Sequence, residues 1–294
     1  MIPSETTIVS CYYPLPKSKH SVREYMYWIF YFLNYVDTSI VLFTDESTAT
    51  SIESIRTYAG LMDRLYIIKK PFHELKFTDA VWFEHWADQL AITNWPNHHT
   101  IPLFIIWANK SFFVQEAIHL NPFQSTYFIW CDAGCWRHSE IAKICGKGWP
   151  DARKITPNKL HIISIISVES FLDRLTTKSS WTHEEVVVDL PVGNDVFLGG
   201  SILLGDREAW AVFIPTFEST LKLYIKNNYF AGDDQFVILS AALWLRVSNP
   251  KHGPIFYKAP KDNGFFNYGE YLIGDRWFAF QQHFSQHHFK LETY

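Results

Sequence analysis

The sequence predicts a single-domain α/β fold, in which a mixed and mostly parallel sheet is flanked by helices. Segments typical of strands and helices alternate from residue 7 to residue 71, which is the pattern of parallel β-α-β units. The 294 residues suit one large α/β unit, and 48% hydrophobic against 19% charged residues supply a sizeable core. Because no linker-like stretch divides the chain, we expect one domain over residues 1–294.

The alternation in the first quarter of the chain can be followed element by element. We expect a strand over 7–12, a helix over 23–36, a strand with its polar loop over 39–47, a helix over 49–60 and a strand over 65–71. Ligands of such sheets bind at the carboxyl ends of the strands. We therefore expect a nucleotide near the loops that begin at Tyr12, Thr44 and Lys69.

The rest of the chain continues the pattern after an insertion. Residues 72–100 are rich in Trp, His and Asn and lack a clean period. The later elements are expected as a helix over 78–92, a helix over 109–119, a strand over 125–134, a strand over 160–167, a strand over 197–205, a helix from 206 to about 227 and a helix after the loop at 227–235. The strand over 125–134 is the most strand-like segment of the chain, and it runs directly into an Asp and a Gly.

Composition excludes several classes of partner. A net charge of −4 and a pI near 6.3, without any block of Lys and Arg, argue against nucleic acid. The four cysteines have neither CxxC spacing nor a second ligand pair, so we expect reduced thiols and no zinc. The first residues, MIPSETTIVS, do not resemble a signal peptide, and no apolar run approaches a membrane span. A cytoplasmic protein is expected.

Carboxylates follow strands at two places where they suit sugar-transfer chemistry. A nucleotide-sugar transferase must neutralise a diphosphate leaving group, commonly with a divalent metal on oxygen ligands, and must hold sugar hydroxyls. Asp132 ends the FIWCDAG segment, and Asp233, Asp234 and Gln235 open a helix. The structural alternative is a turn or cap for Asp132 and a pair of helix-capping residues for Asp233 and Asp234.

The order of these motifs resembles a known pattern. In glycogenin-like retaining GT-A transferases, a strand ending in Asp-x-Asp is followed by F-N-x-G-x-x-L-x-D, a Trp-containing helix and a D-Q at a helix start. The matching runs here are IWCDAG, FLGGSILLGDREAW and GDDQFVI. The resemblance is closer still to the bacterial HtrL/YibB family of proposed glycosyltransferases, in runs at 110–123, 130–137 and 232–235.

This resemblance implies a GT-A-like (Rossmann-like) fold and a glycosyltransferase of the hexosyltransferase type. The donor would be a nucleotide-sugar, with UDP-sugar as the first choice, and the acceptor a hydroxyl on a glycan. Residues 1–135 would form the nucleotide-binding half and residues 136–294 the acceptor- and sugar-binding half.

The implied roles divide into three sets. The catalytic set is Asp234, Asp233 and Gln235; the donor-binding set is Tyr12, Tyr13, Asp45, Lys110, Asp132, Arg137, Gly199 and Gly200; and the metal set, for Mn²⁺ or Mg²⁺, is Asp132 and His252. Either tyrosine would stack on the base. Arg137 and Lys110 would pair with phosphate, or else form structural ion pairs. Asp234 could act as the general base of an inverting reaction, or Asp233 and Gln235 could orient a retaining attack.

The sequence also departs from the glycogenin-like pattern. Gly134 replaces the second Asp of the metal motif, and no HxxGxxKPW supplies a histidine, which leaves His252 or His283 as substitutes. Two alternatives therefore stay open. One is a nucleotidyltransferase, although the loop YYPLPKSKHS lacks the Gly expected after its first strand; the other is a catalytically inactive carbohydrate-binding module. A dehydrogenase is disfavoured because no GxGxxG follows an early strand.

Overall fold

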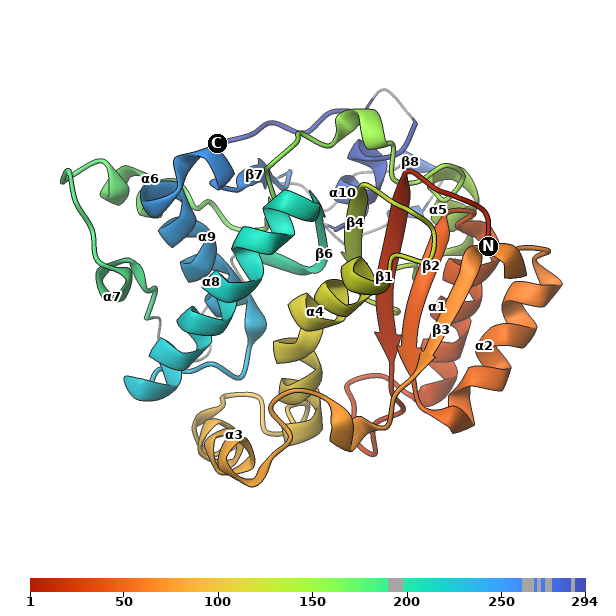
Figure 1. Cartoon of the computed structure of the whole chain (residues 1–294), viewed down its shortest axis with the longest axis horizontal. Helices are drawn as coiled ribbons and strands as arrows, with labels where there is room; N and C mark the ends of the chain where they lie inside the picture. Colours follow the sequence, from red (N-terminus) through yellow and green to blue (C-terminus); the bar gives the residue numbers. More distant parts are fainter. Residues whose placement is uncertain (190–197, 261–266, 269–270, 273–276, 287–288) are drawn as a thin grey trace.

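The computed structural model describes residues 1–189, 198–260, 267–268, 271–272, 277–286 and 289–294. Within them, a seven-stranded sheet forms the centre of the molecule, in the order β3-β2-β1-β4-β6-β5-β7 (Figure 1). Its strands are β1 (Thr6–Tyr12), β2 (Ser39–Thr44), β3 (Leu65–Lys69), β4 (Tyr127–Cys131), β5 (His161–Ser164), β6 (Leu198–Asp206) and β7 (Ile255–Lys258). A separate pair is formed by β8 (Asn267–Tyr268) and β9 (Tyr271–Leu272).

The sheet is mixed and mostly parallel, as predicted. Strands β3, β2, β1 and β4 run parallel to one another, and β5 is parallel to β7, whereas β6 is antiparallel to both β4 and β5. The last residue of β4, Cys131, pairs with Ile202 in the middle of β6, so the residues of β6 before Ile202 extend beyond the end of β4. The beginning of β6 therefore lies at the edge of the sheet where β1 and β4 end.

Helices cover both faces of the sheet (Figure 1). They are α1 (Val22–Tyr35), α2 (Glu46–Tyr58), α3 (Ala80–Ile92), α4 (Ile101–Leu120), α5 (Ser139–Cys145), α6 (Glu169–Leu175), α7 (His183–Val186), α8 (Arg207–Lys226), α9 (Asp234–Ser248) and α10 (Trp277–His283). Short 3₁₀ turns lie at Met62–Arg64, Phe72–Glu74, Ala152–Lys154 and Pro250–His252. One core cluster packs α1, α2, α5 and α10 on the sheet, and the other packs α3, α4, α8 and α9 on the opposite face.

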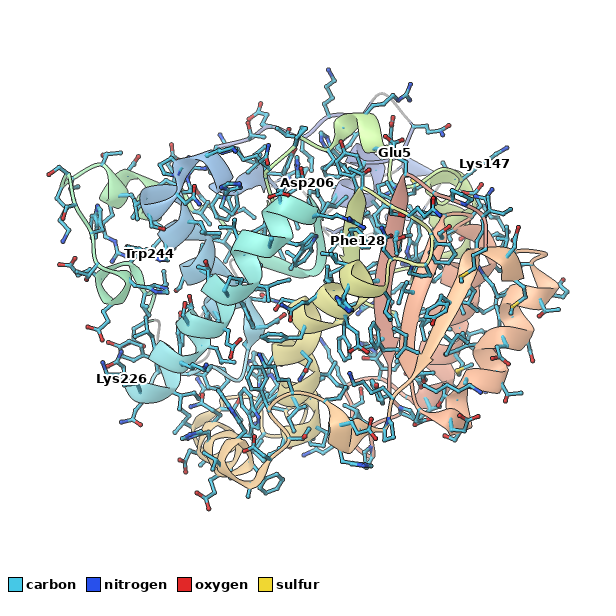
Figure 2. All side chains as sticks on the ribbon, viewed as in Figure 1. Glu5, Phe128, Lys147, Asp206, Lys226 and Trp244 are labelled. Atoms are coloured by element: carbon cyan, nitrogen blue, oxygen red, sulfur yellow. The ribbon has the colours of Figure 1, made fainter. Side chains whose placement is uncertain are left out.

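Both faces of the central strands are buried, which explains their continuous apolar sequences. Phe128 of β4 lies between the sheet and α8, where the Trp210 indole donates a hydrogen bond of 2.8 Å to the Phe128 carbonyl oxygen (Figure 2). Lys226, at the far end of α8, extends to the surface. Helix α8 therefore buries one face in the core and leaves its end in water.

Helix α4 is longer than the sequence predicted. The prediction began this helix at Asn109, but it begins at Ile101. Thr100 caps it by accepting a hydrogen bond from the Leu103 N–H, and Pro102 lies in the first turn, where a missing N–H costs no helix bond. The extra turns place the middle of α4 across the sheet edge at which β1 and β4 end.

A buried arginine joins α2 to the end of α1. Arg56 is fully buried, and its guanidinium donates to the carbonyl oxygens of Leu33, Val36 and Thr38 at 2.7, 2.6 and 2.7 Å. The first two of these carbonyls lie at the C-terminal end of α1, where helix geometry leaves acceptors without partners. Arg56 therefore satisfies the end of one helix from the body of the next.

Candidate functional site

A cavity of about 810 Å³ opens at the carboxyl edge of the sheet. Its lining comes from the end of β1, the turn after β4, the start of β6, the middle of α4 and the start of α9. The predicted position of a ligand site, outside the carboxyl ends of the strands, matches this cavity. The antiparallel β6 contributes its first residues rather than its last, because its direction is reversed.

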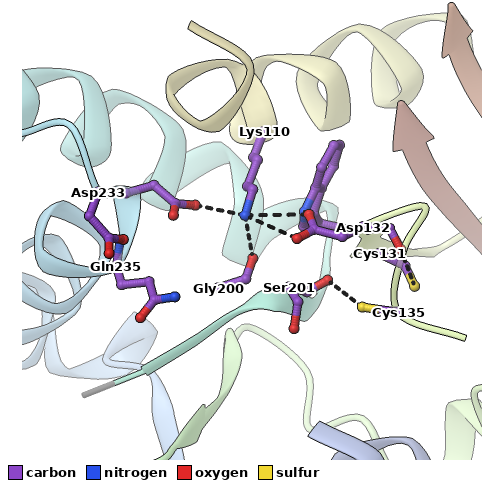
Figure 3. A network of polar contacts seen from close by, with 10 residues as sticks. Lys110, Cys131, Asp132, Cys135, Gly200, Ser201, Asp233 and Gln235 are labelled. Carbon is purple, nitrogen blue, oxygen red and sulfur yellow. Dashed lines mark hydrogen bonds and ion pairs between the residues drawn. The ribbon is translucent and has the colours of Figure 1, made fainter. Parts of the chain in front are cut away.

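A buried lysine forms the centre of the cavity floor (Figure 3). The Lys110 ammonium lies 2.9 Å from Asp234 Oδ2 and 3.3 Å from Asp132 Oδ1, and donates to the Gly200 carbonyl oxygen at 2.9 Å. Its side chain is 5% exposed, that of Asp234 3% and that of Asp132 33%. The cluster thus joins α4, the end of β4, the start of β6 and the start of α9 through one cation. We call these four residues the Lys110 cluster.

Local structure fixes the carboxylate of Asp132. Its backbone N–H donates to the Ser201 carbonyl oxygen at 2.8 Å, which extends the β4–β6 pairing by one residue. The Trp130 indole N–H donates to Asp132 Oδ1 at 2.7 Å, and Cys135 N–H closes a turn on the Asp132 carbonyl oxygen at 3.0 Å. Asp132 therefore points into the cavity with one oxygen already oriented by a tryptophan.

A glycine allows the second carboxylate to approach β6. A Cβ at Gly200 would lie 3.2 Å from Asp234 Oδ2 and 3.3 Å from Gln235 Cγ. A side chain there would press on the carboxylate that holds Lys110. Asp233, the residue before α9, caps the helix by accepting a hydrogen bond of 3.0 Å from the Gln235 N–H. Asp233, Asp234 and Gln235 all line the cavity.

Three carboxylates lie near one ammonium, which forms ion pairs with two of them, Asp132 and Asp234, and acts on the third, Asp233, through its charge. Burial raises the pKa of Asp234 to about 7, although Lys110 opposes the rise and Asp233 adds to it. Burial also raises the pKa values of Asp132 and Asp233, again against the effect of Lys110. Burial alone would lower the pKa of Lys110, but Asp132 and Asp234 outweigh it and raise that pKa above its ordinary value. Lys110 therefore stays charged, and Asp234 can exchange a proton near neutral pH.

Aromatic rings and basic side chains form one side of the cavity mouth. The Arg137 guanidinium lies 4.5 Å from the centre of the Trp28 ring, and the ring of His20 packs edge-on against Trp28 at 4.8 Å. Tyr25 lies 5.2 Å from Trp28 and 5.8 Å from Tyr12. This side offers a cation on a flat aromatic surface, a suitable contact for a phosphate and a planar base.

Another side of the cavity is aromatic and comes from the insertion, the start of α4 and the loop before α9. Trp95, His98, His99, Trp107 and Phe230 line it, and the rings of His99 and Trp107 meet edge-on at 5.4 Å. Sequence reasoning did not identify these residues. The richness of residues 72–100 in Trp and His was the available signal, but no period indicated which rings would face a ligand.

Most of the predicted site residues lie together. The cavity is lined by Tyr12, Tyr13, Lys110, Asp132, Arg137, Gly199, Gly200, Asp233, Asp234 and Gln235. Two of them have additional structural contacts. The Tyr13 hydroxyl donates to the Lys70 carbonyl oxygen at 3.0 Å, and a Cβ at Gly199 would lie 2.5 Å from Ile163 Cγ2, so this glycine is required by packing. Phe197, the first residue of the strand predicted over 197–205, lies outside the described residues.

Asp45 and the two histidines lie outside this cavity. Asp45 caps α2 by accepting from Thr48 N–H at 2.8 Å and from the Ser47 hydroxyl at 2.7 Å. His252 follows the C-terminal end of α9, whereas Asp234 begins that helix, and its ring contacts Asn249 at 3.0 Å. A helix of this length spans roughly 20 Å, so pairing His252 with Asp132 as metal ligands is not supported. His283 accepts from the Leu291 N–H at 3.0 Å on the α10 side.

The residues present do not fit the divalent metal that the resemblance implies. Among the described residues, no group of three His, Cys, Asp or Glu side chains could hold a metal ion. The Lys110 ammonium already lies against Asp132, and a Cβ at Gly134 would lie 3.2 Å from both Trp28 Cε3 and Tyr25 Cε1. Aromatic rings therefore fill the space into which the second Asp of an Asp-x-Asp motif would project.

Fold and cavity together define the class: an α/β protein with a charged ligand cleft at the carboxyl edge of a mostly parallel sheet. Residues 4–247 match the HtrL_YibB family, described as a bacterial protein of unknown function, so the chain belongs to this family and the predicted resemblance is confirmed. The chain is 22% identical over 251 residues to Protein HtrL of Escherichia coli (strain K12), covering 80% of this chain and 83% of HtrL.

Among solved structures, the chain is similar to core-mannan synthase A (CmsA/Ktr4) from Aspergillus fumigatus in its Mn/GDP form. The TM-score is 0.46 at 10% sequence identity, covering 87% of this chain and 72% of the synthase. None of the helices that the structure describes is long and apolar enough to cross a membrane.

Proposed function

We propose that this protein is a glycosyltransferase with a GT-A-like fold, which moves a sugar from a nucleotide-sugar onto an acceptor hydroxyl. The observation that carries the proposal is the Lys110 cluster on the floor of a cavity of about 810 Å³ at the carboxyl edge of the sheet. A cavity of this size is at the upper end of the range for small-molecule sites, large enough for a nucleotide-sugar. Carboxylates with raised pKa values and a buried cation within such a cavity are typical of a reactive centre.

The donor would lie across the first half of the chain, residues 1–135. Tyr12 at the end of β1 and the ring of Tyr25 give the base a flat surface, and Arg137 offers its planar guanidinium to the diphosphate. Lys19 lines the same side of the cavity and adds a second positive charge. UDP-sugar remains the first choice of donor.

The sugar and the reacting hydroxyl would lie against the start of α9. Asp233 and Gln235 line the cavity and are suited to hold sugar hydroxyls, since a carboxylate accepts and an amide both donates and accepts hydrogen bonds. Asp234, whose pKa burial raises to about 7, is suited to take the proton of the attacking hydroxyl. This assignment corresponds to an inverting reaction, and the anomeric configuration of the product, read by NMR, tests it.

The acceptor would be a glycan held by the aromatic side of the cavity. Trp95 is 53% exposed and lines the cavity, so its ring is available to stack on a sugar. We expect Trp95→Ala to raise the KM for the acceptor by roughly tenfold, while the KM for the donor stays unchanged. Tyr58→Ala removes a ring that is 78% exposed elsewhere on the surface and serves as the control. If the KM for the acceptor is unchanged in Trp95→Ala, the ring of Trp95 does not bind the acceptor.

Mn²⁺ or Mg²⁺ is not part of the proposed function, because Lys110 already neutralises the carboxylates that would hold it. A carbohydrate-binding module without turnover is the second candidate, since Gly134 has no room for a metal-binding side chain. We assign the activity to the cytoplasm, because the four free and buried cysteines favour a reducing compartment.

The test is a screen of UDP-, GDP- and CMP-sugars with oligosaccharide acceptors, in which release of the nucleotide and mass of the product are both measured. The proposed function predicts an acceptor-dependent release from one donor. Glycan binding without release from any donor would instead favour the binding module. Absence of both nucleotide and glycan binding would reject the proposal.

A further inference from the structure

The Lys110 side chain is held as a metal ion would be, from several sides at once. An ammonium has three N–H donors. Asp132, Asp234 and the Gly200 carbonyl oxygen are three acceptors on three different elements, all within 3.3 Å of Lys110 Nζ. Asp132 and the Gly200 carbonyl oxygen accept hydrogen bonds from the ammonium, and Asp234 forms an ion pair with it. These contacts fix the nitrogen at the point where β4, β6 and α9 converge.

We propose that Lys110 replaces the divalent cation in this protein, and that its nucleoside diphosphate binds without metal. The part that concerns the nucleotide rests on the proposed function. The part that concerns the metal rests on the Lys110 cluster alone.

The first argument is that a metal ion at Asp132 would meet a positive charge. The Lys110 ammonium lies 3.3 Å from Asp132 Oδ1 and 3.4 Å from Oδ2, and Oδ1 also accepts from the Trp130 indole at 2.7 Å. A divalent cation bound to either oxygen would be within a few ångströms of the ammonium, in a poorly hydrated site. Electrostatic repulsion at that distance opposes binding, so Lys110 excludes the ion whose ligands it uses.

The second argument is the lack of space for a second ligand. The residue two positions after Asp132 is Gly134, and a Cβ on it would touch the rings of Trp28 and Tyr25 at 3.2 Å. Those rings belong to the packed group that supports Arg137 at 4.5 Å. The rings that support Arg137 therefore occupy the space that a metal-binding carboxylate at position 134 would need.

The third argument is the balance of charge. In the Lys110 cluster one ammonium faces two carboxylates, which would leave the floor negative if both were ionised. The rest of the cavity lining adds the carboxylate of Asp233 and the positive charges of Arg137 and Lys19. A diphosphate entering the cavity then meets Arg137 and Lys19 on its lining. Fixed side chains would supply the positive charge that a metal ion supplies in a metal-dependent site.

The first experiment measures nucleotide binding to the wild-type protein. UDP and GDP are titrated calorimetrically in EDTA and again in saturating Mn²⁺. We expect the same Kd in both conditions for the nucleotide that binds. The proposal is overturned if Mn²⁺ lowers the Kd at least about tenfold and if Asp132→Asn abolishes this effect of Mn²⁺.

The second experiment measures Mn²⁺ itself by electron paramagnetic resonance, without nucleotide. The wild type should leave Mn²⁺ free in solution. Lys110→Ala should bind it, because Asp132 and Asp234 would then face each other without a cation, and the double variant Lys110→Ala/Asp132→Asn should lose it again. Lys76→Ala, which breaks an ion pair of 2.8 Å with Glu218 in a more exposed setting, is the matched control and should bind none.

The two experiments separate the two proposals. Wild-type binding of Mn²⁺ that requires Asp132, or a folded Lys110→Ala that binds none, would overturn the role given to Lys110. If no nucleotide binds in either condition, the proposed function fails, while the Mn²⁺ titrations still test Lys110. If Lys110→Ala does not fold, the wild-type titrations decide the question.

Discussion

Two cationic side chains are buried among the residues that the structure describes, Arg56 and Lys110, and their surroundings differ. Arg56 is fully buried, and its guanidinium donates hydrogen bonds to neutral carbonyl oxygens, those of Leu33, Val36 and Thr38. Lys110 is almost as deeply buried and lies between carboxylates. Burial lowers the pKa of Arg56 to about 10, whereas the carboxylates around Lys110 raise its pKa.

The difference teaches that burial of a charge does not by itself mark a functional site. Arg56 completes the hydrogen bonding of a helix end and is not part of the cavity lining. The Lys110 cluster lines the cavity, and its groups can change protonation or contact a ligand. Neutral acceptors indicate a structural cation; ionisable acceptors that face a cavity indicate a reactive one.

The largest expected effect is on kcat, and it comes from a carboxylate that contacts Lys110. We expect Asp234→Asn, which keeps the shape of the side chain, to lower kcat by about 10²–10⁴-fold, because the amide cannot accept the proton of the acceptor hydroxyl. Initial rates of nucleotide release measure this change. Asp88→Asn, on the exposed face of α3, should leave kcat unchanged. A kcat within about twofold of the wild type would remove Asp234 from the chemistry.

The next effect concerns stability and the structural cation. Arg56→Met should lower the free energy of unfolding by roughly 2–5 kcal/mol, because three buried carbonyl oxygens lose their donor. Urea denaturation followed by fluorescence measures it. Nucleotide affinity of the folded protein should be unchanged. Arg64→Met, which loses a single bond of 2.8 Å to the Asp37 carbonyl oxygen, should cost less; equal costs would contradict the role given to Arg56.

A smaller effect should appear in the pH dependence of stability. The pKa of Asp234 rises from 3.8 to about 7 on folding, so the folded state binds more protons between these values. Stability from this group is therefore complete at acidic pH and is lost as pH rises through about 7. When the pH is lowered from about 8 to about 5, the free energy of unfolding of the wild type should rise by about 1–3 kcal/mol more than that of Asp234→Asn. Urea denaturation at each pH measures this difference. If the free energies of unfolding of the two proteins change equally with pH, Asp234 does not titrate in this range.

The smallest effect extends the comparison to a carboxylate that only supports a helix. Asp45→Ala should lower stability by about 1 kcal/mol, since Asp45 caps α2 through the Thr48 N–H. Because Asp45 is not part of the cavity lining, we expect no change in UDP affinity. Calorimetric titration of UDP checks this, and a clear loss of affinity would return Asp45 to the donor site.

Much of the architecture could be predicted from the sequence. Strand and helix alternation predicted the sheet. The carboxyl-end rule predicted a ligand near the loop that begins at Tyr12, and the parallel pairing of β1 with β4 brings Asp132 to the same edge. The start of α4 was placed too late. Its apolar residues surround the helix and gave no periodic signal, so the cap at Thr100 was overlooked.

The candidate site was predicted in its acidic residues but not in its arrangement. Lys110 was expected either to bind phosphate or to form a structural ion pair, and it forms ion pairs with both Asp132 and Asp234. Trp95 and Trp107 were missed, because which ring of a non-periodic segment faces a cavity depends on elements distant in the chain. His252 was paired with Asp132 on motif order alone, which contains no information about the length of α9 between them.

By itself, the sequence determined the family of this protein, its α/β class and the strand ends that carry its carboxylates, because local periodicity and strand direction are encoded in neighbouring residues. Only the tertiary structure decided that one ammonium holds two of those carboxylates and that aromatic rings fill the space beside Gly134. Such contacts join residues as far apart in the sequence as Lys110 and Asp234, and a distance between side chains is set by packing rather than by spacing along the chain.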